Sequence, residues 1–330
     1  MDKSTTTGRG YPIALTSALV LATTAIFIRY LTQTYQMPAL VLALWRDGIV
    51  TLTLLLVLRL LRPHLLRVER RHLRYLIAYG FLLAIFNAFW TLSVALNGAA
   101  VATVLVYCST AFTALLGRWL LSERLGWYKI LAIILCLGGC IFVANALDPA
   151  VWRASSMGIL TGILAGLGYA IYSLMGRSAA QRGLNPWTTV NYTFGFATIF
   201  LLIFNLLPGN FLPGTINRVA DFFWLGDALA GWGILFTLAA GPTLLGFGLY
   251  NLSLSYLPSS VANLIVTLEP VFTALMAYTL LGERLTAIQI LGSAMVMGGV
   301  IFLRIFEGRV GDQDQNPLVG PNSESNLLEV

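Results

Sequence analysis

Long apolar runs, separated by short polar connections, make up most of the chain. A helix that crosses a bilayer needs roughly 20 apolar residues, because each residue adds about 1.5 Å and the hydrocarbon core is about 30 Å thick. Most connections, such as 97–100 and 282–286, leave room only for helical hairpins. The pattern therefore predicts an all-α integral membrane protein. Its ten expected transmembrane helices lie at residues 11–31, 38–61, 73–95, 99–121, 126–146, 157–176, 186–207, 226–252, 259–281 and 286–305.

The composition agrees with a lipid environment and excludes most soluble classes of protein. Hydrophobic residues form 58% of the chain and charged residues 10%, whereas soluble domains carry about 25% charged residues. The net charge of +6 is therefore no sign of nucleic-acid binding, and the lipid bilayer is the expected partner. We expect the first apolar run to be a retained span, because no convincing small-residue cleavage site follows it.

Basic residues orient the spans, since cytoplasmic loops are enriched in Lys and Arg. With the N-terminus in the cytoplasm, 15 of the 20 Lys and Arg residues lie at cytoplasmic ends and 4 at external ends, and only Arg46 lies inside a span. This distribution predicts a multi-pass protein of the cell inner (plasma) membrane with both termini cytoplasmic. The cytoplasmic set is Lys3, Arg9, Arg59, Arg62, Arg67, Arg70, Arg71, Arg74, Arg118, Arg124, Lys129, Arg177, Arg182, Arg304 and Arg309.

An internal repeat relates the two halves of the chain. Residues 99–143 match residues 259–303 at 18 of 45 positions without a gap, and "AFTALLGRWLLSERL" lies over "VFTALMAYTLLGERL". The repeat unit holds five spans, an odd number, so the two copies must cross the membrane in opposite directions. This predicts a 5+5 inverted repeat around a central midplane cavity, the design of many secondary transporters. The expected division is a cytoplasmic segment 1–10, a first five-helix repeat 11–146, an external linker 147–156, a second, inverted repeat 157–306 and a disordered cytoplasmic tail 307–330.

The matched segments also resemble a known family. "LEPVFTALMAYTLLGERLTAIQILGSAMVMGGVIF" (268–302) and "STAFTALLGRWLLSERLGWYKILAIILCLGGCIFVA" (109–144) are similar to the paired spans of the drug/metabolite transporter (DMT) superfamily, EamA type. The resemblance covers all ten expected spans. It implies a 5+5 carrier of the inner membrane that exports amino acids or other small metabolites, and the layout is similar to that of the YddG-like amino-acid exporters.

Glu269 and Pro270 stand at mid-depth in the ninth expected span. A carboxylate at that depth is expensive unless it is protonated, paired or in contact with water, and the proline removes a backbone donor at the same level. Glu269 could line the cavity at a helix break, or it could be a structural tie between helices. The resemblance implies a conformational or architectural role for this Glu-Pro pair. Pro242 is a second expected break or hinge.

Arg46 lies at a similar depth in the second expected span, beside Asp47. An arginine stays charged and needs an anionic or carbonyl partner. Adjacent residues point about 100° apart around a helix, which makes Asp47 a poor direct partner. We expect Arg46 to face Glu269, another midplane group or a substrate carboxylate, and a purely structural role remains the alternative. Glu269 and Asp47 are the acidic residues at depth, so they are the candidates for proton coupling.

Aromatic and amide side chains supply further candidates for the wall of the cavity. Trp90 and Tyr250 occupy equivalent positions in the repeat, and aromatic walls suit amphiphilic substrates or ammonium groups. Ordinary helix packing is the alternative for each residue. The candidates for substrate binding are Arg46, Asn87, Trp90, Tyr107, Tyr250, Asn251 and Glu269, with Tyr169, Tyr172, Tyr192, Ser109, Thr110 and Asn263 as further cavity residues.

Several kinds of chemistry have no support in the sequence. His64 and His72 both fall in a basic loop, no phosphate-binding glycine-lysine loop is present and no nucleophile-base pair lies at depth. We therefore expect no enzyme, no cofactor and no metal. The hypothesis is a secondary transporter, monomeric or weakly dimeric, that exports small metabolites such as aromatic or amphiphilic amino acids by alternating access. The alternative is a passive channel or facilitator, and protons are a candidate partner.

Overall fold

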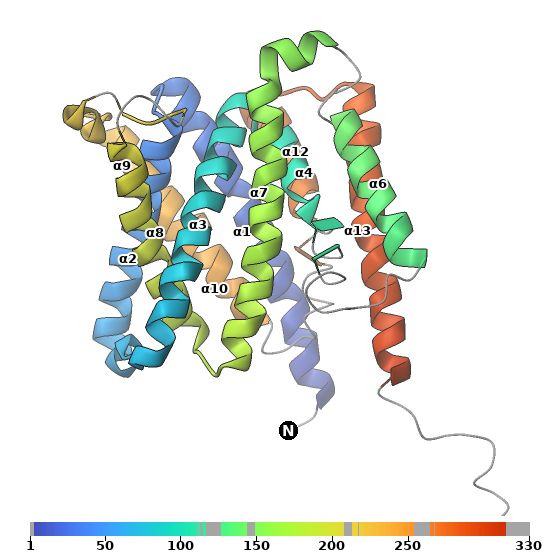
Figure 1. Ribbon diagram of the computed structural model, residues 1–330, viewed down its shortest axis with the longest axis horizontal. Coiled ribbons are helices and arrows are strands. Elements are labelled where there is room, and N and C mark those ends of the chain that lie inside the picture. Colours follow the sequence, from blue (N-terminus) through green and yellow to red (C-terminus); the bar gives the residue numbers. More distant parts are fainter. Residues whose placement is uncertain are drawn as a thin grey trace, which may run out of the picture.

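The computed structural model is helical and describes residues 3–109, 111–112, 115–116, 127–143, 149–207, 213–216, 218–253, 265–266 and 268–314. Its longer helices pack side by side as a bundle (Figure 1). The helices are α1 (Lys3–Thr34), α2 (Ala39–Leu61), α3 (Arg70–Asn97), α4 (Ala99–Val106), α6 (Trp127–Val143), α7 (Pro149–Gln181), α8 (Pro186–Leu206), α9 (Leu229–Leu238), α10 (Leu244–Ser253), α12 (Glu269–Leu281) and α13 (Ala287–Asp314), with short turns η1 (Pro63–Leu66), η2 (Val219–Phe223) and η3 (Ala239–Thr243).

The chain is a multi-pass membrane protein. Six helical segments among the described residues are long and apolar enough to cross a bilayer. Shorter apolar helices at Ile130–Val143, Glu269–Leu281 and Ala287–Leu303 accompany them. Large apolar side chains on the outside of the bundle, such as Leu275 and Leu280, are more than 60% exposed, as expected of helices that face lipid tails. The six segments of sufficient length and hydropathy are Gly10–Thr34, Ala39–Leu61, Arg70–Asn97, Ser156–Gly176, Pro186–Leu206 and Leu229–Tyr250.

Helices of the first half of the chain pack on helices of the second half, and each main contact has a counterpart in which the roles of the two halves are swapped. α3 and α4 pack on α7, and α10 and α12 pack on α1. α2 packs on α8, and α6 packs on α13 at one side of the bundle (Figure 1). α1 begins and α13 ends at the end of the bundle that also carries the α2–α3 and α7–α8 connections (Figure 1).

Glycines allow α6 and α13 to approach closely. A methyl group added to Gly139 would lie 2.6 Å from the Gly292 carbonyl oxygen, and one added to Gly299 would lie 3.0 Å from the Cys136 sulfur. The Cys136 thiol donates to the carbonyl oxygen of Val296 at 3.8 Å. Cys136 and Val296 are equivalent residues in the sequence repeat, at an offset of 160.

Two of the expected spans are interrupted. We expected a continuous helix over 99–121, but α4 ends at Val106 and a turn follows at Tyr107–Cys108. In the expected span 259–281, a turn at Leu268 precedes α12. Both turns are closed by bonds from an amide to the carbonyl three residues earlier, Cys108 to Leu105 at 3.1 Å and Leu268 to Ile265 at 3.0 Å.

The two interruptions have corresponding backbone geometry. The amides of Ala111 and Phe112 both donate to the Cys108 carbonyl, at 2.9 and 3.2 Å. The amides of Val271 and Phe272 both donate to the Leu268 carbonyl, at 3.0 and 3.1 Å. Each of these residues lies 160 positions after its counterpart. Discontinuous helices of this kind supply binding sites in many transporters, because they free backbone groups inside the membrane.

Three other boundaries differ from the expected ones. α1 starts at Lys3 and α7 at Pro149, which lies within the expected linker 147–156. α13 continues to Asp314, past the expected boundary at residue 306.

The eighth expected span contains the π-helical turn η3, which includes Pro242, and the Thr243 hydroxyl donates to the Leu238 carbonyl at 2.9 Å. A proline inside a helix leaves a carbonyl without its donor, and a local π adjustment accommodates it.

Candidate transport site

Arg46 and Asp47 form an ion pair inside the bundle. Their side chains are 2% and 0% exposed, and the Arg46 Nε lies 3.1 Å from the Asp47 Oδ1. The expectation that Asp47 is a poor partner for its neighbour is therefore wrong. The arginine side chain is long enough to curl around the helix to the adjacent carboxylate, although the two Cα–Cβ bonds diverge.

Asn87 completes the surroundings of this carboxylate from the neighbouring helix α3. Its Nδ2 donates to the Asp47 Oδ2 at 2.6 Å, so both carboxylate oxygens have a partner. The Arg46 Nη1 and Nη2 atoms have no hydrogen-bond partner among the described residues. A guanidinium offers five N–H groups, so Arg46 keeps donors for a further acceptor while Asp47 balances its charge.

Glu269 is the other charged residue of the site. Its partner is Tyr107 and not Arg46, the partner that we expected. The Tyr107 hydroxyl lies 3.1 Å from the Glu269 Oε2 and donates to the Val266 carbonyl at 2.9 Å. Tyr107 and Val266 are buried, whereas Glu269 is only partly covered. The contact joins the two interruptions, since Tyr107 follows α4 and Glu269 begins α12.

The free Val266 carbonyl follows directly from the Glu-Pro sequence. In a continuous helix this carbonyl would accept from the amide of residue 270, but Pro270 has no N–H. Tyr107 supplies the missing donor from another helix. The sequence carried a signal for this partner, because the carbonyl that a proline deprives lies four residues before it.

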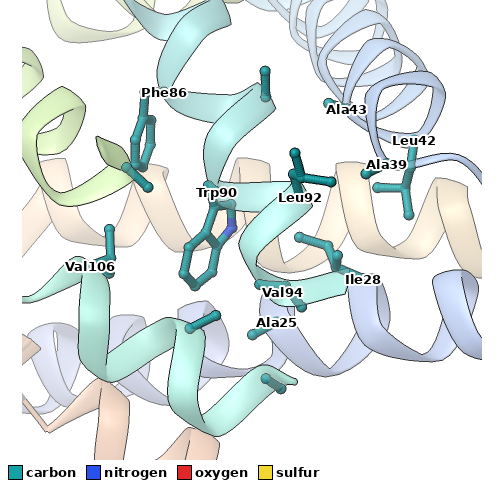
Figure 2. Packing of buried hydrophobic residues seen from close by; sticks show 14 of the residues in the cluster. Ala25, Ile28, Ala39, Leu42, Ala43, Phe86, Trp90, Leu92, Val94 and Val106 are labelled. Carbon is teal, nitrogen blue, oxygen red and sulfur yellow. The ribbon is translucent and has the colours of Figure 1, made fainter. Parts of the chain in front are cut away.

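Aromatic rings pack where α3, α4 and α7 meet. Phe86 and Trp90 project from one side of α3, with Val106 of α4 facing Trp90 (Figure 2). Phe86 packs on Tyr169 and Tyr172 of α7, at ring-centre distances of 5.6 and 6.3 Å. Phe86 was absent from the expected cavity residues, because one phenylalanine in an apolar run carries no distinguishing signal.

Tyrosines extend from this aromatic cluster toward both the Arg46–Asp47 pair and Glu269. Tyr169 and Tyr250 are within electrostatic range of the Tyr107 hydroxyl, and Tyr172 is within range of both Tyr250 and Asp47. The structure therefore brings most of the expected site residues into one region: Arg46, Asp47, Asn87, Trp90, Tyr107, Tyr169, Tyr172, Tyr250 and Glu269.

The remaining candidates lie elsewhere or outside the description. The Tyr192 hydroxyl donates to the Leu66 carbonyl at 2.8 Å, in the α2–α3 connection. Asn251 lies in α10, but its side chain is outside the described part of the chain. Thr110 and Asn263 also lie outside the described residues.

A second polar cluster closes one end of the bundle. The Glu283 carboxylate accepts from the amides of Ala99 and Ala100, at 2.9 and 3.2 Å. The Arg29 Nε lies 3.3 Å from the Glu283 Oε1, and an Arg29 Nη donates to the Ala95 carbonyl. The cluster ties α1, the α3–α4 junction and the α12–α13 turn together, and it uses two of the amides that a helix start leaves free.

Comparison with known proteins identifies the family. The EamA-like transporter family matches residues 8–145 and again residues 156–305. The chain belongs to this family. It is therefore a membrane transporter for small molecules and not an enzyme, and the resemblance to the EamA type is confirmed.

Individual members of the family agree with this assignment. An "uncharacterized transporter" of Archaeoglobus fulgidus is 28% identical over 223 residues, covering 66% of this chain and 73% of the relative. A "probable amino-acid metabolite efflux pump" of Salmonella typhimurium is 26% identical over 212 residues, covering 64% of this chain and 69% of the relative. One solved crystal structure superposes with a TM-score of 0.60 at 16% identity and covers 92% of this chain and 99% of its own, a likeness of fold alone.

Proposed function

We propose that this EamA-family transporter exports small zwitterionic metabolites, with amino acids as the leading class, by alternating access of two inverted five-helix halves. The bond between Tyr107 and the Val266–Glu269 segment carries the proposal, since it joins two interrupted spans at equivalent positions of the repeat. The double family match, the exchanged pattern of helix contacts and the Cys136–Val296 contact support the inverted architecture.

The charges of the site support a zwitterionic substrate. Arg46 keeps Nη donors for a substrate carboxylate, whereas Glu269 is an acidic group without a basic partner among the described residues. Aromatic rings between these positions suit an apolar substrate side chain. The amino-acid efflux pump of Salmonella typhimurium favours the same class.

The orientation of the chain and the assignment to the inner membrane rest on charge. The basic connections 62–74 and 177–183 lie at the end of the bundle where α1 begins and α13 ends (Figure 1). Cytoplasmic loops are the ones enriched in Lys and Arg. We therefore assign both termini to the cytoplasm and the protein to the inner membrane, with ten spans in all and with residues 11–146 and 157–306 as the two halves.

Protons are the proposed driving ion, with Glu269 as the carrier. Asp47 is the weaker candidate, because Arg46 and Asn87 occupy both of its oxygens. A passive channel remains the second candidate function. It has the same helices but does not need the Tyr107 contact to break.

Uptake into proteoliposomes tests the proposal. We expect radiolabelled phenylalanine to enter with saturable kinetics and to accumulate when a pH gradient is imposed. Flux that never saturates and ignores the gradient would favour the channel. Arg46→Lys keeps the charge but loses the planar donor pair, so we expect it to raise KM for phenylalanine more than it lowers kcat.

A further inference from the structure

We propose that Glu269, Tyr107 and the Val266 carbonyl form a cation site, which holds a proton on Glu269 in the described arrangement and exchanges that proton for the ammonium group of a substrate. The proposal rests on the transport function above and names what each charged end of the site recognises. It assigns Tyr107 as the residue that links occupancy of the site to the contact between the two interrupted spans.

The first observation is that the Val266 carbonyl needs a hydrogen-bond donor from outside its own helix. Pro270 deprives this carbonyl of its helical donor, and the group is buried. An unpaired buried carbonyl costs about 1–3 kcal/mol. The Tyr107 hydroxyl lies 2.9 Å from this carbonyl and 3.1 Å from the Glu269 Oε2, and we assign its single proton to the shorter bond, with Val266.

The second step is the contact that remains. The Tyr107 oxygen also lies 3.1 Å from the Glu269 Oε2. A phenol has one proton to donate, so with that proton on Val266 both atoms of the second contact are acceptors. Two acceptors at this distance repel each other unless a proton or another donor lies between them. A proton on Glu269 resolves the conflict, since the acid donates to Tyr107 and Tyr107 donates to Val266.

The surroundings favour a compact cation over other donors. Tyr169 of α7 and Tyr250 of α10 interact electrostatically with Tyr107, as Glu269 does, and aromatic rings attract ammonium groups. The α12 helix also packs on α1, whose Arg29 is held by Glu283 at the far end of α12. Arg46 is paired with Asp47. An ammonium therefore meets a carboxylate, a phenol oxygen and a ring without a competing basic group among these residues.

The exchange is balanced in charge and atoms. A protonated Glu269 and an alkylammonium ion become a Glu269 carboxylate with a bound ammonium and one released proton. The ammonium has three N–H donors, so it can bridge Glu269 and the Tyr107 oxygen in place of the single acid proton. When neither cation is bound, the single Tyr107 proton must serve both the Glu269 carboxylate and the Val266 carbonyl, so one of them is left without a donor, and this favours separation of the two interrupted spans. The site thereby connects its occupancy to the geometry of the helices.

Infrared difference spectroscopy of the purified protein in lipid nanodiscs tests the bound proton without a transport assay. We expect the carbonyl stretch of a protonated carboxylic acid to disappear as the pH is raised and to be absent in Glu269→Gln. If the wild type and Glu269→Gln give the same spectra at every pH, the assigned proton is wrong.

The variant Tyr107→Phe distinguishes a Glu269 that donates to Tyr107 from a Tyr107 that donates to Glu269. If the Tyr107 oxygen accepts from a neutral Glu269, its removal destabilises the acid, and the midpoint of the acid signal moves to lower pH. If Tyr107 instead donates to an ionised Glu269, its removal moves the midpoint to higher pH. A shift upward or no shift would overturn the proposal. Tyr192→Phe, at the Leu66 carbonyl, is the matched control and should leave the midpoint unchanged.

Three probes with one ring test the ligand class: phenylalanine, phenethylamine and phenylpropionate. We expect phenylalanine and phenethylamine to release protons from the wild type and to reduce the acid signal, and phenylpropionate to do neither. If phenylalanine is transported but leaves the acid signal unchanged, the exchange is wrong. If none of the three compounds is transported while the acid signal and its downward shift in Tyr107→Phe are found, the proposed substrate class fails and the proton site stands.

Discussion

The Arg29 Nε and the Glu283 Oε1 lie 3.3 Å apart, and through this pair the C-terminal part of α1 is joined to the turn between α12 and α13. The same carboxylate accepts from the amides of Ala99 and Ala100. One acidic side chain thus serves as an ion-pair partner and as the cap of another helix.

Glu283→Gln should loosen this end of the bundle. The amide oxygen can still accept one bond, but it loses the charge that pairs with Arg29 and favours a helix start. The loss of a cap costs about 0.5–2 kcal/mol. Hydrogen exchange should become faster at the amides of Ala99 and Ala100, and the thermal midpoint should fall. Unchanged exchange at these two amides would show that the carboxylate does not protect them.

Gly98→Ala should destabilise the same end through the backbone. Gly98 has φ +87°, and a methyl group there would lie 2.7 Å from the Glu283 Oε1. A non-glycine residue held in such a conformation costs about 1–3 kcal/mol. Gly233→Ala is the matched control, because Gly233 lies in α9 with open space around it. Thermal unfolding should show a lower midpoint for Gly98→Ala and none of that loss for Gly233→Ala.

Asp47→Ala should be far more harmful than removal of the whole ion pair. It leaves Arg46 buried without its partner, and breaking a buried pair costs about 3–5 kcal/mol. The double variant Arg46→Met, Asp47→Leu replaces both charges with apolar groups and should recover part of the thermal stability, because the buried Asn87 amide still loses its acceptor. Phenylalanine transport should be lost in the double variant. Full transport by a stable double variant would mean that Arg46 has no part in recognition.

Pro270→Ala should stabilise the fold and slow transport. The alanine restores an N–H that can donate to the Val266 carbonyl, so α12 can continue into the preceding turn and Tyr107 loses its acceptor. The thermal midpoint should rise, and the rate of phenylalanine uptake should fall, because the interruption is part of the proposed conformational change. A variant that is more stable and transports normally would remove the interruption from the mechanism.

The sequence predicted the membrane class and the family, and most of the residues it singled out for the site lie in one region of the structure. Arg46, Asp47 and Glu269 were found because a charge is conspicuous in an apolar run. The partner of Arg46 was missed because the Cβ directions of neighbouring residues do not limit a side chain as long as arginine.

The interruption after Val106 was harder to predict, since "VYCST" contains neither Pro nor Gly. Pro270 marks the equivalent interruption near Glu269. Because Thr110 is the repeat counterpart of Pro270 at the offset of 160, the repeat predicts an interruption near Thr110 as well. A repeat can therefore reveal an irregularity in the copy that lacks the residue which causes it. Contacts such as Tyr107 with Val266 depend on how distant helices meet, which local patterns do not encode.

The contact of Cys136 with its repeat counterpart Val296 has an energetic consequence under the proposed alternating access of two inverted halves. Residues beside an axis of exchange meet the same neighbours whichever half is tilted. The packing of α6 on α13 then stabilises the outward-open and the inward-open form equally, so this helix pair does not favour either form. The preference between the two forms is left to the small polar clusters at the ends and the centre of the bundle, where one proton or one ligand is enough to reverse it.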